Sequence, residues 1–259
     1  RIRRYVDKLF IIFPFEVAYF AGKGIDAVYE GNPLMDAVAE RCAAMPPREE
    51  FLQANGLGGR PVIALLAGSR RSEVRNNLPF MTALAELMPE YDFVLAAVPW
   101  LGTELYAELL AGSRIVCLYD KTYEVVRYAD AAVVTSGTAT LETALIGTPE
   151  VVCYRTDALT VWAGRRLLKI PYISLVNLVM DREIVKELIQ QDMTPERAAA
   201  ELRTILPGGA QRERMLADYG SLRERIGGPG ASERVAARMV ELLRGGGDSL
   251  RGNDNGAKR

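Results

Sequence analysis

The chain has 259 residues, of which 49% are apolar and 25% are charged, and its formal net charge is −1. These values are ordinary for a globular protein with a substantial core, and the near-neutral charge gives no electrostatic reason to expect a nucleic-acid partner. The sequence contains no histidine. Acid–base chemistry must therefore come from carboxylates or from another chain.

The cysteine content favours a chain that works in a reducing compartment, and the apolar runs do not predict a membrane span. No apolar run reaches the roughly 18 residues of a membrane span, because Pro14 and Glu16 interrupt the apolar stretch 9–20. No signal-peptide pattern is recognisable at the start. The cysteines are odd in number and lack metal-ligand spacing, which is typical of small buried side chains: Cys42, Cys117 and Cys153.

Short apolar runs alternate with helical patterns along most of the chain. The runs are nearly continuous in Val, Ile, Leu and Ala, as in strands buried on both faces. We predict an α/β fold, with a Rossmann-like parallel sheet flanked by helices and further helices at the C-terminus. The predicted strands are 8–13, 27–31, 62–68, 92–98, 114–120, 131–137, 150–155 and 172–177, and the predicted helices between them are 77–90, 102–111, 122–129, 138–147, 157–169 and 181–191.

Three helices are predicted after residue 180, where the strands stop. The first, 194–206, begins with Thr194 as N-cap and Pro195 at the first helical position. The others are 210–226 and 231–244, and the Gly-rich segment 245–259 is predicted to be a disordered tail. Residues 31–60, which open with a turn into a helix, are interpreted as the connection from the end of one domain to a complete second one.

The segment LLAGSRRSEVRNNLPFM (65–81) takes a predicted strand into a helix through a polar loop. Gly68 allows a close backbone approach to a ligand, while Ser69 and Arg70 offer a hydroxyl and a guanidinium for phosphate oxygens. An ordinary strand-to-helix turn with a solvated basic loop explains the pattern equally well. The segment lacks the GxxxxGK[ST] pattern of a P-loop.

The segment TSGTATLETALIGTPEVV (135–152) makes a second strand-to-helix turn. Ser136, Gly137 and Thr138 stand at a helix start, where free backbone N–H groups and the helix dipole favour an anion. Glu142 follows one turn later, and its carboxylate suits a ribose diol. The alternative is a polar first turn with no ligand.

Two later segments carry weaker signals. In YISLVNLVMDREIVKEL (172–188), Asn177 is predicted to end the last strand and Glu183 to stand in the opening turn of the next helix. Both are also ordinary turn and helix-start residues. In LTVWAGRRLLK (159–169), apolar and basic residues alternate, from Trp162 to Lys169. Such a helix can lie on an anionic membrane, but more often it packs its apolar side inward.

Taken in order, these segments resemble the lipid-A-disaccharide synthases, bacterial glycosyltransferases of the GT-B type. The resemblance is carried by AGSRRSEV (67–74), TSGTATLETALIGTPEVVCYR (135–155) and the block 165–202 that contains SLVNLVMDREIVKEL. Residues 10–38 resemble the end of that family's first domain and its crossover. The similarity extends over about residues 5 to 205.

The resemblance implies transfer of 2,3-diacylglucosamine from UDP to 2,3-diacylglucosamine 1-phosphate (lipid X), with release of UDP, in lipid A biosynthesis. It implies a cytoplasmic enzyme on the inner membrane, with no cofactor or metal and no nucleic-acid partner, and a candidate homodimer. The domains would be the end of an acceptor domain and crossover, the UDP-sugar domain, a C-terminal helix and the tail: 1–36, 37–226, 227–244 and 245–259.

The resemblance also implies roles for individual residues. Arg70 would lie by the departing UDP as a leaving-group stabiliser, and Glu142 would bind the ribose. The main chain of Ser136 to Ala139 would hold the diphosphate. The full expected donor site is Gly68, Ser69, Arg70, Ser136, Gly137, Thr138, Ala139, Glu142, Tyr154, Arg155, Asn177 and Glu183.

The chain departs from the family pattern at three points. Ala67 stands where a proline is usual, and Asn32 where a histidine is common. The first domain of the family, with the acceptor site and a carboxylate base, would precede Arg1, so we expect the natural protein to continue upstream and the fragment alone to be inactive. Two alternatives stay open: another GT-B UDP-sugar enzyme, such as a transferase or an epimerase, and a catalytically silent UDP-binding module.

Overall fold

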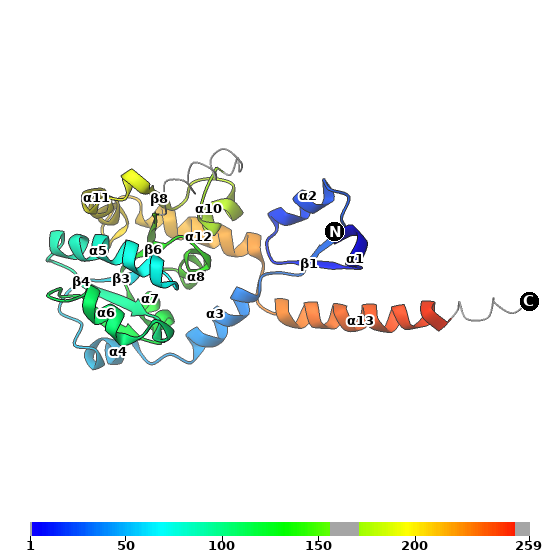
Figure 1. Cartoon of the computed structure of the whole chain (residues 1–259), viewed down its shortest axis with the longest axis horizontal. Coiled ribbons are helices and arrows are strands. Elements are labelled where there is room, and N and C mark those ends of the chain that lie inside the picture. Colours follow the sequence, from blue (N-terminus) through cyan, green and yellow to red (C-terminus); the bar gives the residue numbers. More distant parts are fainter. Residues whose placement is uncertain (1, 156–170, 252–259) are drawn as a thin grey trace, which may run out of the picture. The chain divides into compact units, whose positions relative to one another are not determined.

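The computed structural model describes the backbone of residues 2–155 and 171–251 (Figure 1). The chain forms two compact units, Arg1–Ala39 with Glu224–Arg259, and Glu40–Arg223. The sequence-based division treated the two ends of the chain separately, whereas the structure groups them in one unit.

The first unit contains a small parallel sheet, in which β1 (Leu9–Ile11) pairs with β2 (Ala27–Tyr29) where the sequence predicts strands. Its last helix runs beyond residue 244 to Arg251, through part of the segment predicted to be a disordered tail, and residues 252–259 lie outside the described residues. The helices are α1 (Ile2–Tyr5), α2 (Phe15–Ala21), most of α3 (Pro33–Ala43) and α13 (Ala231–Arg251).

Asp36 ties α3 to the start of α13 within this unit. Its carboxylate accepts hydrogen bonds from the backbone N–H of Ser232, at 3.0 Å, and of Gly230. These two N–H groups stabilise the charged carboxylate and lower the pKa of Asp36. Arg234 adds a bond from Nε to the carbonyl of Glu30, at 3.0 Å. The N-terminus of α13 is therefore capped by a side chain and anchored next to β2.

The second unit is built on a six-stranded sheet in which every pair of neighbours is parallel. The spatial order is β5-β4-β3-β6-β7-β8, so that the chain starts in the middle, builds outward to one edge, and returns to build the other. This is the doubly wound order of Rossmann folds. The strands are β3 (Val62–Leu66), β4 (Asp92–Ala97), β5 (Val116–Tyr119), β6 (Ala131–Thr135), β7 (Glu150–Tyr154) and β8 (Lys186–Ile189).

Helices cover both faces of this sheet, because right-handed crossovers on the two sides of the central strands lead to opposite faces (Figure 1). On one face α5 (Arg71–Leu87) packs against α6 (Thr103–Leu109) and α11 (Pro195–Ile205). On the other face α8 (Thr138–Ile146) packs against α7 (Thr122–Tyr128) and α10 (Leu175–Met180). The other described helices of this unit are α4 (Arg48–Ala54), most of α12 (Arg212–Ile226), η1 (Pro99–Leu101) and η2 (Gln190–Asp192).

The central strands explain why the sequence predicts a sheet covered on both faces. Every residue of β3 and β6 is buried, including the side chains on both sides of each strand. An alternating pattern would have left one face polar, whereas these strands are apolar except for Thr135 at the end of β6. The predicted fold class is confirmed.

The predictions for residues 172–191 are wrong. Residues 175–177, predicted as the end of the last strand, start α10 instead, and its N-cap Ser174 accepts a hydrogen bond from the backbone N–H of Asn177 at 3.2 Å. Residues predicted as a helix contain the edge strand β8. A short apolar run fits a buried helix as well as a strand, and the charges of Lys186 and Glu187 gave β8 a helix-like pattern. The predicted helix 157–169 lies outside the described residues.

No helix in the described part of the chain has the length and apolar character needed to cross a membrane.

Glu150 is an exception in the apolar interior of the second unit. It is the first residue of β7, its side chain is fully buried, and neither carboxyl oxygen has a hydrogen-bond partner among the described residues. The hydroxyl of Tyr219, also fully buried, is a neighbouring polar group, and its interaction with the carboxylate lowers the pKa of Glu150 against the larger effect of burial. Burial raises the pKa of Glu150 well above its ordinary value. The native state therefore holds a proton that the unfolded chain releases near pH 4.3, an approximate reference value.

We expect the Glu150→Gln variant to gain stability relative to the unmodified chain as the pH rises. Above the unfolded pKa of about 4.3, the native state binds more protons than the unfolded state, so each pH step lowers the stability of the unmodified chain until the raised pKa is passed. Urea unfolding between about pH 5 and pH 8 measures this difference. The exposed Glu196 supplies the control variant Glu196→Gln. A stability difference independent of pH would contradict the assignment.

Candidate functional site

The candidate site lies at the carboxyl ends of β3 and β6, which are neighbours in the middle of the sheet. Leu66 lies opposite Val134 in the paired strands, so the loops that follow them, at 67–70 and 136–137, start side by side. One loop leads to α5 and the other to α8, on opposite faces. This is the point where the winding of the sheet reverses, and in such folds ligands bind beyond it.

Asn77 holds these two loops together from within α5. Its side chain is buried, and the amide NH₂ donates to the carbonyl of Ala67 at 3.1 Å and to the hydroxyl of Thr135 at 2.9 Å. Both amide hydrogens are thus used, one on each strand end. Sequence reasoning missed this residue, although a polar side chain on the apolar side of a helix, next to Val74, Leu78 and Met81, is a usable signal.

The first loop is shaped by Gly68 and Glu73. Gly68 has a φ of 112°, and a Cβ atom there would lie 2.6 Å from the side chain of Glu73. The Glu73 carboxylate accepts from the backbone N–H of Ser69 at 2.9 Å and of Arg70 at 3.2 Å, and it pairs with the Arg70 guanidinium at 2.7 Å. Glu73 therefore caps α5, while the Arg70 side chain remains 79% exposed. Glycine is required here by both conformation and space.

The second loop leaves the start of α8 open. Ser136 is committed to the fold, because its N–H donates to the carbonyl of Cys153 and its hydroxyl to that of Ile173, both at 2.9 Å. By contrast, no acceptor within the described residues takes the backbone N–H of Gly137, Thr138 or Ala139. The first turn of α8 also contains no acidic residue. An anion at this position would receive free N–H donors and the favourable end of the helix dipole.

Glu142 lies one turn into α8 and is held from the neighbouring helix. Its Oε1 accepts a hydrogen bond from the Tyr123 hydroxyl of α7 at 2.7 Å. Burial, and then this hydrogen bond, raise the pKa of Tyr123, so the phenol stays protonated and keeps donating. The guanidinium of Arg41 lies 4.9 Å from the Tyr123 ring centre. The half-buried carboxylate keeps a second oxygen, which no described side chain or backbone group uses.

The other predicted site residues divide between the two edges of the sheet. Tyr154 is the last residue of β7 and Arg155 follows it at the carboxyl edge, where Arg155 donates to the carbonyl of Met193 at 2.8 Å. Glu183 lies before β8 at the amino edge, where it pairs with Lys186 at 3.2 Å. The structure therefore does not bring Glu183 to the candidate site, and it stands in a loop instead of the predicted helix.

Asn177 is completely buried, and its side-chain NH₂ and carbonyl oxygen are both hydrogen-bonded within the protein. Its amide donates to the carbonyl of Val185 at 2.9 Å and to the Glu187 carboxylate at 2.8 Å. Its carbonyl oxygen accepts from the backbone N–H groups of Ile184 and Val185, at 2.8 and 3.1 Å. Asn177 thus fixes the segment between α10 and β8, and a direct contact with a ligand stays a prediction.

The fold and the two loops define the class of this chain: it is a Rossmann-like α/β protein of the GT-B kind, with its open helix start at the reversal point of the sheet. The family model described as Lipid-A-disaccharide synthetase matches residues 1–234. The chain belongs to this family.

Curated relatives agree with that family. The lipid-A-disaccharide synthase of Myxococcus xanthus (strain DK1622) is 39% identical over 249 residues, which cover 93% of this chain and 64% of the relative. That of Geobacter metallireducens (strain ATCC 53774 / DSM 7210 / GS-15) is 37% identical over 250 residues, covering 94% and 64%. The chain therefore spans less than two thirds of the length of these relatives.

Solved structures show similarity of the fold. The UDP-GlcNAc 2-epimerase from Neisseria meningitidis, bound to UDP-GlcNAc, has a TM-score of 0.57 at 13% identity, covering 88% of this chain and 59% of that structure. The S. aureus MnaA–UDP co-structure has a TM-score of 0.58 at 14% identity, covering 91% and 59%.

We expect Asn77→Ala to lower the free energy of unfolding by about 1–3 kcal/mol, because it leaves the Ala67 carbonyl and the Thr135 hydroxyl without their buried donor. Denaturant unfolding measures the change. The neighbouring Asn76 is exposed, and Asn76→Ala is the matched control that should stay within about 0.5 kcal/mol of the unmodified chain. Equal losses in the two variants would contradict the role given to Asn77.

Proposed function

We propose that this chain binds the UDP part of a nucleotide-sugar donor at the carboxyl edge of its sheet. The observation that carries the proposal is the open start of α8, with Glu142 one turn behind it, at the reversal point of a doubly wound sheet. Free N–H groups and a helix dipole suit a diphosphate, and a carboxylate with a vacant oxygen suits a ribose diol.

The individual roles follow from this placement. The backbone N–H groups of Gly137, Thr138 and Ala139 donate to phosphate oxygens, and Glu142 accepts from the ribose hydroxyls. Arg70, whose guanidinium is mostly exposed beyond β3, reaches the phosphate that departs with UDP. Asn77 and Tyr123 do not touch the donor; they position the two loops and the Glu142 carboxylate.

The natural protein is proposed to be a glycosyltransferase that moves 2,3-diacylglucosamine from UDP to lipid X. The acceptor hydroxyl oxygen forms a bond to the anomeric carbon, the bond from that carbon to the UDP oxygen breaks, and the hydroxyl proton passes to a base. This chain offers the stabilisation of UDP, and the base is assigned to the family's first domain. The names and identities of the curated relatives support this reaction.

A different UDP-sugar reaction is the second candidate, because the fold is shared with a UDP-GlcNAc 2-epimerase. The family match and the identity of the relatives favour the transferase.

A lipid substrate further implies work at the cytoplasmic surface of a membrane. The basic stretch 159–169, which we interpret as a membrane-contact candidate, lies outside the described residues.

We expect Glu142→Ala to weaken UDP binding about 10- to 100-fold, the loss of charge-assisted hydrogen bonds worth about 1.5–3 kcal/mol. Calorimetric titration with UDP measures the affinity, and circular dichroism checks that the domain stays folded. Glu86 is exposed near the C-terminal end of α5, away from the loop at 67–70. The control variant Glu86→Ala should therefore bind UDP like the unmodified chain. Unchanged UDP affinity in Glu142→Ala would rule out the ribose contact.

The natural protein, including any residues that precede Arg1, is expected to convert UDP-diacylglucosamine and lipid X into UDP and a disaccharide. Mass spectrometry of the products distinguishes transfer from epimerisation, which would leave the UDP-sugar intact as an isomer. In the same preparations the protein is expected to float with anionic vesicles. UDP binding without either product would favour a binding module instead.

A further inference from the structure

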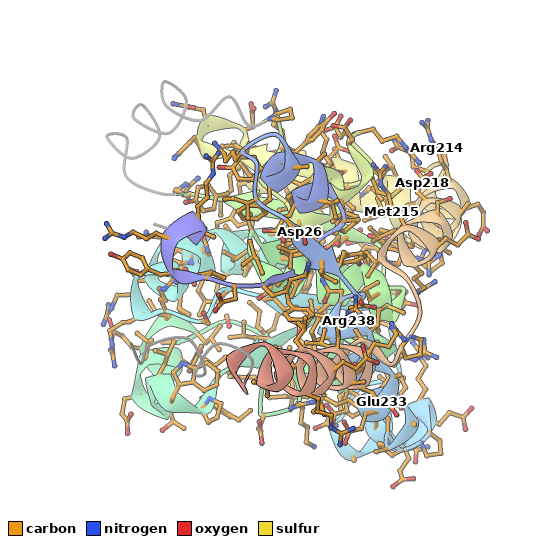
Figure 2. All side chains as sticks on the ribbon, turned by 90° about the vertical axis from the view of Figure 1, so that its right-hand side faces the viewer. Asp26, Arg214, Met215, Asp218, Glu233 and Arg238 are labelled. Atoms are coloured by element: carbon orange, nitrogen blue, oxygen red, sulfur yellow. The ribbon has the colours of Figure 1, made fainter. Side chains whose placement is uncertain are left out.

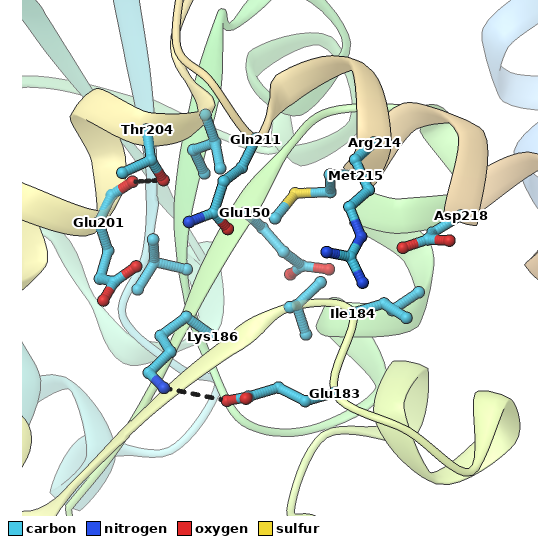
Figure 3. A pocket seen from close by; sticks show the side chains of 13 residues that line it. Glu150, Glu183, Ile184, Lys186, Glu201, Thr204, Gln211, Arg214, Met215 and Asp218 are labelled. Carbon is cyan, nitrogen blue, oxygen red and sulfur yellow. Dashed lines mark hydrogen bonds and ion pairs between the residues drawn. The ribbon is translucent and has the colours of Figure 1, made fainter.

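The carboxylate assigned to the ribose is held by a neutral group. Glu142 accepts from the Tyr123 hydroxyl at 2.7 Å, and no lysine or arginine in the described part of the chain forms an ion pair with it. Glu183, at the amino edge of the sheet, instead pairs with the cation of Lys186 at 3.2 Å (Figure 3). A phenol orients a carboxylate without cancelling its charge, so Glu142 offers a ligand both a fixed direction and a negative charge.

Tyr123 has little freedom to turn away from Glu142. It lies in the first turn of α7, its side chain is buried, and α7 packs against α8, which contains Glu142. A ring packed in the interior keeps its rotamer on average, so the hydroxyl stays directed at the carboxylate. The hydrogen bond therefore fixes which oxygen of Glu142 is used inside the protein and which one is left for a ligand.

Arg41 contacts the ring of Tyr123 from the last turn of α3. Its guanidinium carbon lies over this ring, 4.9 Å from the ring centre. Another exposed arginine, Arg238 of α13 (Figure 2), pairs with the carboxylate of Glu241 at 2.9 Å. Arg41 forms no such ion pair with a described residue. Its charge is attracted instead by the negative face of the aromatic ring.

The charge of Arg41 also acts on the Tyr123 hydroxyl. Burial raises the pKa of Tyr123 most and the hydrogen bond to Glu142 raises it further, whereas the nearby guanidinium of Arg41 lowers it. A cation that favours the deprotonated phenol makes the hydroxyl a stronger hydrogen-bond donor. Arg41 thus strengthens the hydrogen bond that directs Glu142.

The segment that follows α3 is attached to the other end of α7. The hydroxyl of Tyr128 donates to the carbonyl of Pro46, and Nε of Arg48 donates to the carbonyl of Tyr128 at 3.3 Å. Arg48 is exposed like Arg41 and also contacts α7, but at the end of the helix opposite to Tyr123. Arg48 is therefore a matched control for an arginine that supports α7 without acting on Glu142.

We propose that Arg41 and Tyr123 are positioning residues for the Glu142 carboxylate, and that they determine how strongly the chain selects a nucleotide with ribose hydroxyls. Tyr123 directs one carboxylate oxygen and leaves the other for the ribose, while Arg41 strengthens the Tyr123 hydrogen bond. This inference rests on the proposed binding of UDP and extends it to two residues that do not touch the donor.

Calorimetric titration with UDP and with 2′,3′-dideoxy-UDP tests the proposal, because the second nucleotide keeps the base and the diphosphate but lacks both ribose hydroxyls. The ratio of the two affinities measures the selection of these hydroxyls. We expect Tyr123→Phe and Arg41→Ala to lower this ratio, Arg41→Ala by about two- to fivefold, without changing the affinity for the dideoxy nucleotide. Arg41→Lys keeps a cation and should retain most of the ratio, and Arg48→Ala should retain all of it.

Unchanged ratios in Tyr123→Phe and Arg41→Ala would overturn the proposal, and so would an equal decrease in Arg48→Ala. Equal losses of affinity for both nucleotides would indicate a general structural effect and would also overturn it. A ratio that falls in Tyr123→Phe alone would overturn the role of Arg41.

Glu142→Ala separates this inference from the proposed function. If that variant loses the preference for UDP while Arg41→Ala and Tyr123→Phe keep it, the ribose contact is supported and the positioning role is wrong. If the unmodified chain binds both nucleotides equally, the ribose contact itself is wrong, and the positioning role with it.

Discussion

The parallel pairing of β3 with β6 is the constraint on which the site depends. These two strands are separated in sequence by two other strands, yet they lie side by side in the middle of the sheet. Their connections lead to opposite faces, so the loops after them part and leave room at the carboxyl edge. Asn77 adds a hydrogen bond to each strand end, including one to Thr135, 58 residues away in sequence. The pairing thus brings together two polar loops that would otherwise have no relation.

Much of the fold could be predicted because the strands are buried on both faces and therefore read as continuous apolar runs. The strand-to-helix turns at Gly68 and Gly137 could be found for the same reason, since each follows a buried strand. Asn77 and Tyr123 could not be given a role from local sequence. Their partners, Thr135 and Glu142, are distant in the chain and meet them only in the folded sheet.

The error at residues 172–191 has a local physical cause. The apolar run before Asn177 fits either a buried strand or a short helix, and the choice is made by interactions outside the run. The Ser174 hydroxyl and the backbone N–H groups of Ile173 and Ser174 all donate to the carboxylate of Glu187, at 2.7 to 3.0 Å. Glu187 lies in β8, so the start of α10 is fixed by hydrogen bonds to this strand. The sequence pattern had predicted a helix at β8.

The carboxyl groups of Glu142 and Glu150, at opposite edges of the sheet, have opposite environments. At the carboxyl edge Glu142 is half-buried, held by the hydroxyl of Tyr123, and keeps one oxygen available. At the amino edge Glu150 is fully buried, and neither oxygen has a partner in the described residues. The first arrangement leaves an oxygen that a ligand can reach, whereas the burial of Glu150 favours the neutral acid.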